Sequence, residues 1–158
     1  MADANATIVI VDDEEMVLTS LESFLSLETE YQVDTFSSPT EALEFIRGHD
    51  VNLVISDYLM PEMDGISLLA KVREAKPDVT RIILTGYADK ENAIKAINEV
   101  GLFQYVEKPW DNEDLRIIIR NGLEKQELMQ SLRSKIDEIE KAYGDLQKIQ
   151  QDILKTFA

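Results

Sequence analysis

The feature that most restricts the fold is a fivefold alternation between short apolar runs and longer segments with helical spacing. The first run, Thr-Ile-Val-Ile-Val at 7–11, is almost wholly apolar, as expected of a parallel strand buried on both faces. Four further runs are predicted as strands, at 31–36, 53–55, 81–84 and 104–107. Strands that alternate with helices through short connections predict a parallel sheet covered by helices on both faces.

Helix-start and helix-stop signals separate these strands. Residues 38–41, Ser-Pro-Thr-Glu, form a capping box with proline at the first helical position, and Gly48 ends that helix. Asp89 and Asp111 are expected to cap the two later helices. The usual arrangement of five such units is the α/β, flavodoxin-like (βα)5 doubly wound fold with strand order 2-1-3-4-5. Ligands of this fold bind beyond the carboxyl ends of the strands, where the order reverses, so we expect the site there.

The last helix is predicted to extend far beyond a domain of this kind. From Asn112 to about Phe157 there is no proline, and the only glycines are Gly122 and Gly144. Roughly 45 residues at about 1.5 Å each give a helix of about 68 Å. Apolar residues recur along it in steps of three and four, an a/d heptad pattern: Met129, Leu132, Ile136, Ile139, Tyr143, Leu146, Ile153 and Phe157, with Gln150 at one a position.

This heptad pattern predicts a parallel, dimeric coiled coil, and hence a homodimer. Lys135 at a g position would pair with Glu140 at the following e position of the partner helix, while Ile149 and Leu154 widen the apolar seam. The alternative is a helix folded back on its own domain, which no turn signal before residue 144 favours. We expect a domain at 5–125 and a coiled-coil signalling helix at 126–158. Because the apolar pattern still runs at Ala158, an output domain absent from this chain is also expected.

The formal net charge of −15 restricts the class of partner. Such a surface repels nucleic-acid phosphates and anionic lipids, so we expect no direct nucleic-acid binding and no membrane binding. The absence of cysteine excludes disulfides, thiolate metal sites and cysteine nucleophiles. No apolar run approaches about 18 residues, and residues 1–6 lack the pattern of a secretory signal, so a cytoplasmic location is expected.

Residues able to do chemistry stand at the predicted carboxyl ends of the strands. Asp12 and Asp13 follow the first strand and Asp57 the third, while Thr85 and Lys108 follow the fourth and fifth. Strands one and three are neighbours in the 2-1-3-4-5 order, so the three acids are expected to converge. Singly, each residue would be interpreted as a helix cap or a surface side chain. Together, three carboxylates that repel by about 1 kcal/mol or more per pair favour a hard cation such as Mg²⁺.

These residues and their surroundings resemble the receiver domain of two-component response regulators over roughly residues 5–125. The resemblance is carried by four segments: Asp12-Asp13, 57–65 (Asp-Tyr-Leu-Met-Pro-Glu-Met-Asp-Gly), Thr85-Gly86 and 105–109 (Tyr-Val-Glu-Lys-Pro). It implies that Asp57 accepts phosphate from a sensor histidine kinase. It also implies that Lys108 pairs with the phosphoryl oxygens, and that Mg²⁺ is bound by Asp12, Asp13, Asp57 and the backbone carbonyl of Leu59.

The resemblance further implies a conformational switch. Thr85 would move to bond a phosphoryl oxygen, and Tyr105 would rotate inward to fill the vacated space. The expected function is that of a response regulator receiver in a two-component phosphorelay, which controls the coiled-coil dimer and a downstream output or partner. We expect a phosphoacceptor switch rather than an enzyme, one that catalyses only its own phosphorylation and dephosphorylation.

Three rival functions share some of these features. A phosphatase that forms an aspartyl phosphate requires a second acid two residues after the nucleophile, and position 59 is leucine. A flavodoxin-like nucleotide binder places its phosphate loop after the first strand, where residues 12–15 (Asp-Asp-Glu-Glu) would repel phosphate; no GxxxxGK[ST] loop of an NTPase occurs either. A receiver-like scaffold that is never phosphorylated remains the third, and the complete set of chemical positions argues against it.

Overall fold

The computed structural model describes residues 5–157, apart from the side chains of Tyr87 and Phe157. Five parallel strands form one sheet in the order β2-β1-β3-β4-β5, as the sequence predicts. The strands are β1 (Thr7–Val11), β2 (Gln32–Phe36), β3 (Leu53–Asp57), β4 (Thr80–Thr85) and β5 (Gln104–Glu107). The order reverses between β1 and β3, which places the expected site where these two strands end.

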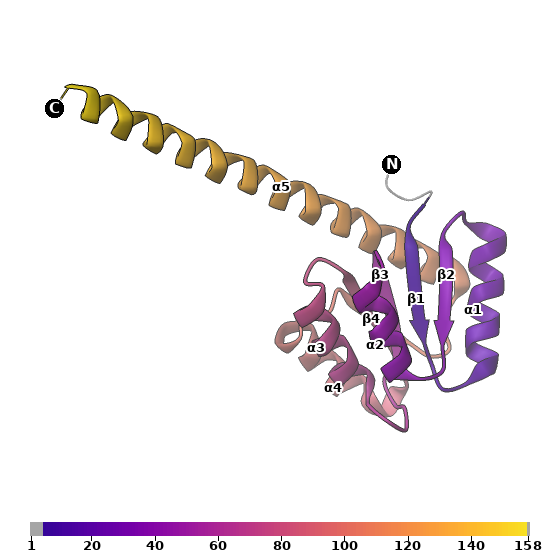
Figure 1. Cartoon of the computed structure of the whole chain (residues 1–158). Coiled ribbons are helices and arrows are strands. Elements are labelled where there is room, and N and C mark those ends of the chain that lie inside the picture. The colour runs from indigo at the N-terminus through magenta and orange to yellow at the C-terminus, as the bar shows by residue number, and fades with distance from the viewer. Residues whose placement is uncertain (1–4, 158) are drawn as a thin grey trace. The chain divides into compact units, whose positions relative to one another are not determined.

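The helices alternate with the strands (Figure 1) and have the bounds α1 (Glu15–Glu28), α2 (Pro39–Gly48), α3 (Gly65–Ala75), α4 (Lys90–Glu99) and α5 (Asn112–Phe157). Two predicted caps are confirmed, since the Ser38 side chain accepts from the amide of Glu41 and the Asp111 carboxylate accepts from the amide of Asp114 at 3.1 Å. The prediction that the Asp89 side chain caps α4 is wrong. A 3-10 turn at Tyr87–Asp89 gives Asp89 φ −105° and ψ 5°, not the extended backbone that aims a capping side chain at the helix.

The sheet is buried on both faces because successive side chains of a strand point to opposite sides. One face packs against α2, α3 and α4, with Val9, Val54 and Ile83 fully buried there. The other face packs against α1 and the first part of α5, with Ile10 and Ile55 fully buried there. The continuous apolar runs of the sequence therefore reflect burial on both sides.

Packing contacts divide the chain into two compact units, Met1–Gln126 and Glu127–Ala158. In the first unit, Leu115, Ile119 and Leu123 of α5 are buried against the sheet. Gly122 permits this approach, since a Cβ there would lie 2.9 Å from Cγ2 of Thr80. Within the described residues, no helix combines the length and the apolar character that a membrane span requires.

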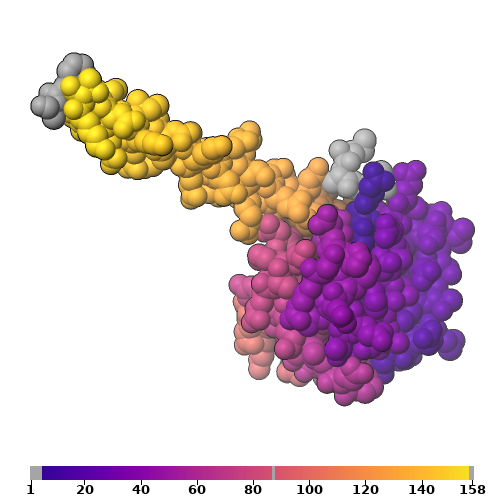
Figure 2. Space-filling view, in the orientation of Figure 1, coloured from indigo at the N-terminus to yellow at the C-terminus, as the bar shows by residue number. Residues whose placement is uncertain are grey.

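The second unit is helical throughout its described residues. In the space-filling view, the orange-to-yellow segment is one continuous rod (Figure 2). Its large apolar side chains are exposed, for example Ile139 at 67% and Leu146 at 64%. A stripe of this kind on an otherwise polar helix needs an explanation, because monomeric proteins rarely expose long apolar strips.

Candidate functional site

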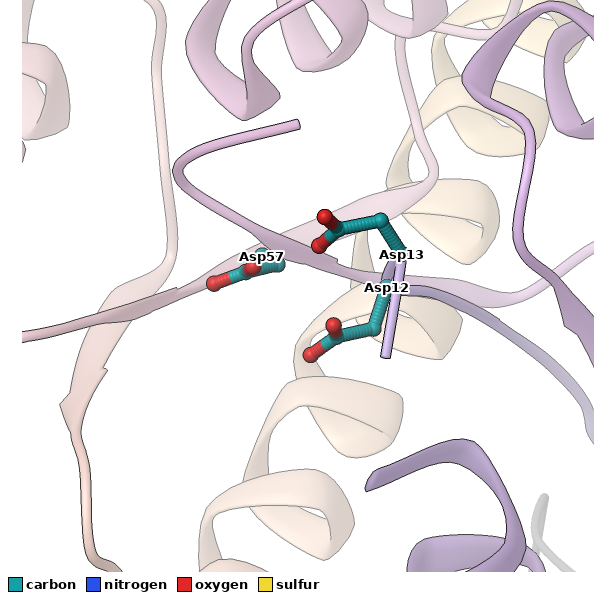
Figure 3. Close-up of side chains that lie close together, drawn as sticks. All are labelled: Asp12, Asp13 and Asp57. Atoms are coloured by element: carbon teal, nitrogen blue, oxygen red, sulfur yellow. The ribbon is translucent and has the colours of Figure 1, made fainter. Parts of the chain in front are cut away.

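The carboxyl ends of β1 and β3 bring three acids together. Asp12 and Asp13 directly follow β1, and Asp57 is the last residue of β3. Each offers a carboxylate oxygen, and the three oxygens lie within 4.8 Å of one another. In the close-up, the three side chains lie close together at the ends of the two strands, with Asp12 and Asp13 pointing toward the side of Asp57 (Figure 3). Asp12 and Asp57 are buried, whereas Asp13 is exposed, so the cluster is open on one side.

Lys108, directly after β5, supplies the cation of the site. Its Nζ donates to Oδ1 of Asp57 at 2.8 Å and to Oδ2 of Asp12 at 3.4 Å. Burial opposes the charged ammonium, but the hydrogen bond to Asp57 and the negative charges of Asp12 and Asp57 outweigh it and raise the pKa of Lys108. Lys108 is therefore a fixed positive charge at physiological pH.

Asp12 is the acid of the cluster whose ionisation is made unfavourable by its surroundings. Burial, together with the negative charge of Asp57, raises the pKa of Asp12 to about 6, although the Glu14 amide donates to its Oδ1 at 2.9 Å and opposes the rise. A carboxyl group with such a pKa is ionised at neutral pH only against a penalty. A bound divalent cation would remove this penalty by placing positive charge among the acids.

Thr85 and Tyr105 lie on β4 and β5 and are not part of the acidic cluster. Thr85 ends β4 and is fully buried, and its hydroxyl donates to the carbonyl oxygen of Gly86 at 3.1 Å. Its own carbonyl accepts from the amide of Lys108 at 2.9 Å, which ties the ends of β4 and β5 together. Tyr105 is half-buried and packs against the core on the side of α2, α3 and α4. The Thr85 hydroxyl thus lies on the strand next to that of Asp57, and the Tyr105 ring lies one strand further along the sheet.

Two hydrogen bonds at the site come from backbone amides, so no side-chain type in the sequence indicates them. The amide of Tyr58 donates to Oδ1 of Asp57 at 2.9 Å, in the same way as the Glu14 amide donates to Asp12. Both amides belong to the turn that follows a strand, so they orient the carboxylates before any ligand is present. Only the general expectation that strand-end turns offer free amides could have indicated them.

Gly65 permits the close packing behind Asp57. A Cβ at this position would lie 2.1 Å from the carbonyl oxygen of Asp57 and 2.6 Å from Cδ1 of Ile83. The amide of Gly65 also donates to the carbonyl of Tyr58 at 2.8 Å, which closes the turn between β3 and α3. Asp64 caps α3 by accepting from the amide of Ser67 at 2.7 Å. The first turn of α3 thereby supports the backbone that carries Asp57.

A parallel, doubly wound sheet with this set of side chains defines a receiver-type site, and the comparisons agree. The chain belongs to the response regulator receiver domain family, whose model matches residues 8–120. It is 37% identical over 128 residues to the hydrogenase transcriptional regulatory protein HoxA of Cupriavidus necator, covering 81% of this chain and 26% of that protein. It thus spans about a quarter of the length of this relative.

Two further comparisons cover more of the compared protein. The chain is 32% identical to the response regulator protein TmoT of Ectopseudomonas mendocina, over 98% of this chain and 70% of that one. The solved structure of a response regulator receiver domain protein from Clostridium thermocellum matches with a TM-score of 0.74 and 35% identity, over 78% of this chain and 98% of that one. The receiver fold is therefore shown both by sequence and by structure.

The seam predicted from the heptads follows the second unit as a row of exposed apolar residues: Met129, Leu132, Ile136, Ile139, Tyr143, Leu146, Ile149, Ile153 and Leu154. Two shallow grooves on this helix are lined by seam residues, one around Leu132 and one around Leu146. Within the single helix, Nζ of Lys135 lies 3.8 Å from Glu138, and both side chains are well exposed. Such an exposed pair contributes little to stability, so it leaves Lys135 able to choose another partner.

Proposed function

We propose that this chain is a phosphoacceptor switch in which Asp57 takes a phosphoryl group from a sensor histidine kinase. The observation that carries the proposal is the 2.8 Å contact between Nζ of Lys108 and Oδ1 of Asp57, within a cluster of three converging carboxylates. A carboxylate becomes an effective nucleophile toward phosphorus when the charge on the phosphoryl oxygens is neutralised and the reacting atoms are held in line. In this proposal, Lys108 would pair with those oxygens.

In the proposed step, an Asp57 oxygen attacks the phosphorus of a phosphohistidine. The new P–O bond forms as the P–N bond breaks, and the bonding electrons leave on the histidine nitrogen, which takes up a proton. Lys108 exchanges its contact with Asp57 for one with the phosphoryl oxygens. The metal would be Mg²⁺, which supplies charge neutralisation when bound, and its proposed ligands are Asp12, Asp13, Asp57 and the backbone carbonyl of Leu59.

Phosphorylation is proposed to act through Thr85 and Tyr105. A phosphoryl group adds a charge of about −1.5 to −2 and three acceptor oxygens beside Lys108. The Thr85 hydroxyl, which now donates to Gly86, would exchange this partner for a phosphoryl oxygen. Tyr105, half-buried against the core, would turn into the space that Thr85 leaves. The chain would catalyse only its own phosphorylation and dephosphorylation.

The output is proposed to run through a parallel homodimer of the C-terminal helix. An exposed apolar seam four heptads long is the surface that a second copy would bury. In a parallel, in-register pair, Lys135 faces Glu140 of the other helix, and Ile149 faces Leu154 of the other helix. The first of these flanking pairs joins opposite charges, and the second joins two apolar side chains. The dimer would in turn control a partner or an output domain outside this chain.

Beryllofluoride, a phosphoryl analogue, tests this function. With Mg²⁺ present, the wild-type chain is expected to bind it at Asp57 and the Asp57→Asn variant is not. Isothermal titration calorimetry of both proteins reports the difference, and circular dichroism checks that the variant is folded. Equal binding by wild type and Asp57→Asn would contradict the proposal.

A further inference from the structure

Two side chains at the amino-terminal end of the sheet hold α5 in place. Oγ1 of Thr80, the first residue of β4, donates to the carbonyl oxygen of Gly122 at 2.7 Å. Nδ2 of Asn52, directly before β3, donates to Oε1 of Gln126 at 3.1 Å. Thr80 and Gln126 are only 4% and 3% exposed. We refer to Asn52, Thr80, Gly122 and Gln126 as the helix anchor.

The helix anchor is continuous with the hydrogen bonds of the sheet. Oδ1 of Asn52 accepts from the amide of Thr7 at 2.9 Å, and the amide of Asn52 donates to the carbonyl of Thr7 at 2.9 Å. The amide of Thr80 donates to the carbonyl of Asn52 at 3.1 Å. Because Gly122 lacks a Cβ, the helix lies close enough for the Thr80 hydroxyl to reach its backbone. A polar network in which Thr80 and Gln126 are buried, Asn52 is half-buried and the side chains are paired fixes one position of the helix.

The strands of the helix anchor also carry the phosphoacceptor site, at their opposite ends. β3 begins beside Asn52 and ends in Asp57, while β4 begins at Thr80 and ends in Thr85. β3 pairs with β4 over its whole length, from Leu53 opposite Thr80 to Asp57 opposite Leu84, and every residue of both strands is buried. Close-packed strands move as units between discrete arrangements and do not deform continuously. A displacement of β4 at Thr85 is therefore expected at Thr80 as well.

We propose that the helix anchor couples phosphorylation of Asp57 to the strength with which α5 is held against the sheet. Its hydrogen bonds favour the unphosphorylated arrangement, in which the Thr85 hydroxyl donates to Gly86, and they weaken when Thr85 moves toward a phosphoryl group. The proposal rests on the proposed function of Asp57. Coupling between two sites is reciprocal, so weakening the helix anchor must in turn raise the affinity of Asp57 for a phosphoryl analogue.

Thr80→Val is the test variant, since it removes the hydroxyl and keeps a side chain of similar shape. The matched control is Thr29→Val, which removes a threonine hydroxyl that donates to a carbonyl at the end of α1. Beryllofluoride affinity is measured on the full chain with Mg²⁺ by calorimetry. Thr80→Val is expected to bind about fivefold more tightly than wild type, at the lower end of typical coupling between sites, with Thr29→Val unchanged.

Amide hydrogen exchange and a second variant complete the test. Exchange of α5 around Gly122 and Gln126 is expected to be faster in Thr80→Val and in Gln126→Met than in wild type. Both variants are expected to bind beryllofluoride more tightly. Unchanged or weaker beryllofluoride binding by both, or unchanged exchange, would overturn the inference. Failure of the wild type to bind would overturn the proposed function, and this inference with it.

Discussion

Lys108 and Asp57 stand 51 residues apart in the sequence, and their side chains meet at 2.8 Å at the carboxyl edge of the sheet. Lys108 also contacts Asp12, so one ammonium group serves acids from two different strands. The contact offsets charge that would otherwise be concentrated at the cluster. It also marks the place where an incoming anion can take over the ammonium group.

Lys108→Met is expected to weaken beryllofluoride binding by about 10- to 100-fold, because a hydrogen bond to a charged group is lost. Binding of Mg²⁺ alone is expected to be as tight as in wild type or tighter, since the three acids lose their competing cation. Calorimetric titrations separate the two ligands. Lys90→Met is the control, since Lys90 lies 3.8 Å from Glu107 and has no contact with the acids among its described ion pairs. Equal losses in both variants would contradict the assigned role.

Magnesium affinity is expected to fall as pH drops through about 6, the pKa of Asp12 in the metal-free protein. Below that pH a proton must leave Asp12 before the metal can bind, so affinity decreases by up to tenfold per pH unit. Titrations at several pH values between neutral and acidic test this. The Asp12→Asn variant should bind more weakly throughout and lack this step. A wild-type affinity independent of pH over the range would contradict the assignment.

The same raised pKa predicts a change in stability. The folded-state pKa of about 6 lies well above the ordinary aspartate pKa of 3.8, so ionised Asp12 disfavours the folded state. The penalty is absent below the unfolded pKa, grows as pH rises through this window and is complete above about pH 6, where it reaches about 3 kcal/mol. Magnesium should therefore raise the melting temperature more at pH 7 than at pH 5. An equal increase in melting temperature at pH 7 and at pH 5 would contradict this prediction.

Gly65→Ala is expected to destabilise the domain by about 3 kcal/mol or more, because the new Cβ would overlap the carbonyl oxygen of Asp57. Gly144→Ala is the matched control within a helix, since a Cβ there meets no atom within 4 Å. It should stabilise α5 by about 1 kcal/mol. Thermal unfolding of both variants gives the comparison. If Gly65→Ala is as stable as wild type, α3 does not support the Asp57 backbone.

The coiled-coil seam is tested by charge. Leu146→Lys is expected to shift the chain toward monomer, because it places a charge at a d position, whereas Ser134→Lys on the outer f position should not. Lys135→Glu should weaken the dimer by several-fold, and adding Glu140→Lys should restore it in a parallel pair. Sedimentation equilibrium measures these changes. A monomeric wild type at all concentrations, or no rescue by the double change, would contradict the parallel dimer.

The strand order and the convergence of the acids were predictable because they follow from topology. Once β1 and β3 are neighbours, residues at their carboxyl ends must meet, and Asp12, Asp13 and Asp57 do. The cap at Ser38 was equally predictable, since its pattern is local. The failed cap at Asp89 shows the limit, because the 3-10 turn before it depends on how β4 meets α4 in space.

The features that could not be predicted from the sequence depend on contacts between residues far apart along the chain. The bond between Asn52 and Gln126 joins positions 74 apart, and neither residue type signals a contact. In the sequence Gly122 is only one of two glycines in a long helical segment, whereas in the structure it lets α5 approach Thr80. The raised pKa of Asp12 likewise depends on burial, which a list of strand-end acids does not reveal.

Direct phosphorylation of Asp57 tests the central claim. The full chain is incubated with acetyl phosphate, a small phosphodonor, and Mg²⁺, then followed by intact-protein mass spectrometry and peptide mapping. The account predicts the gain of one phosphoryl group on the peptide that contains Asp57, lost when Mg²⁺ is chelated and absent in Asp57→Asn. No gain in mass, or the same gain in Asp57→Asn, would contradict it.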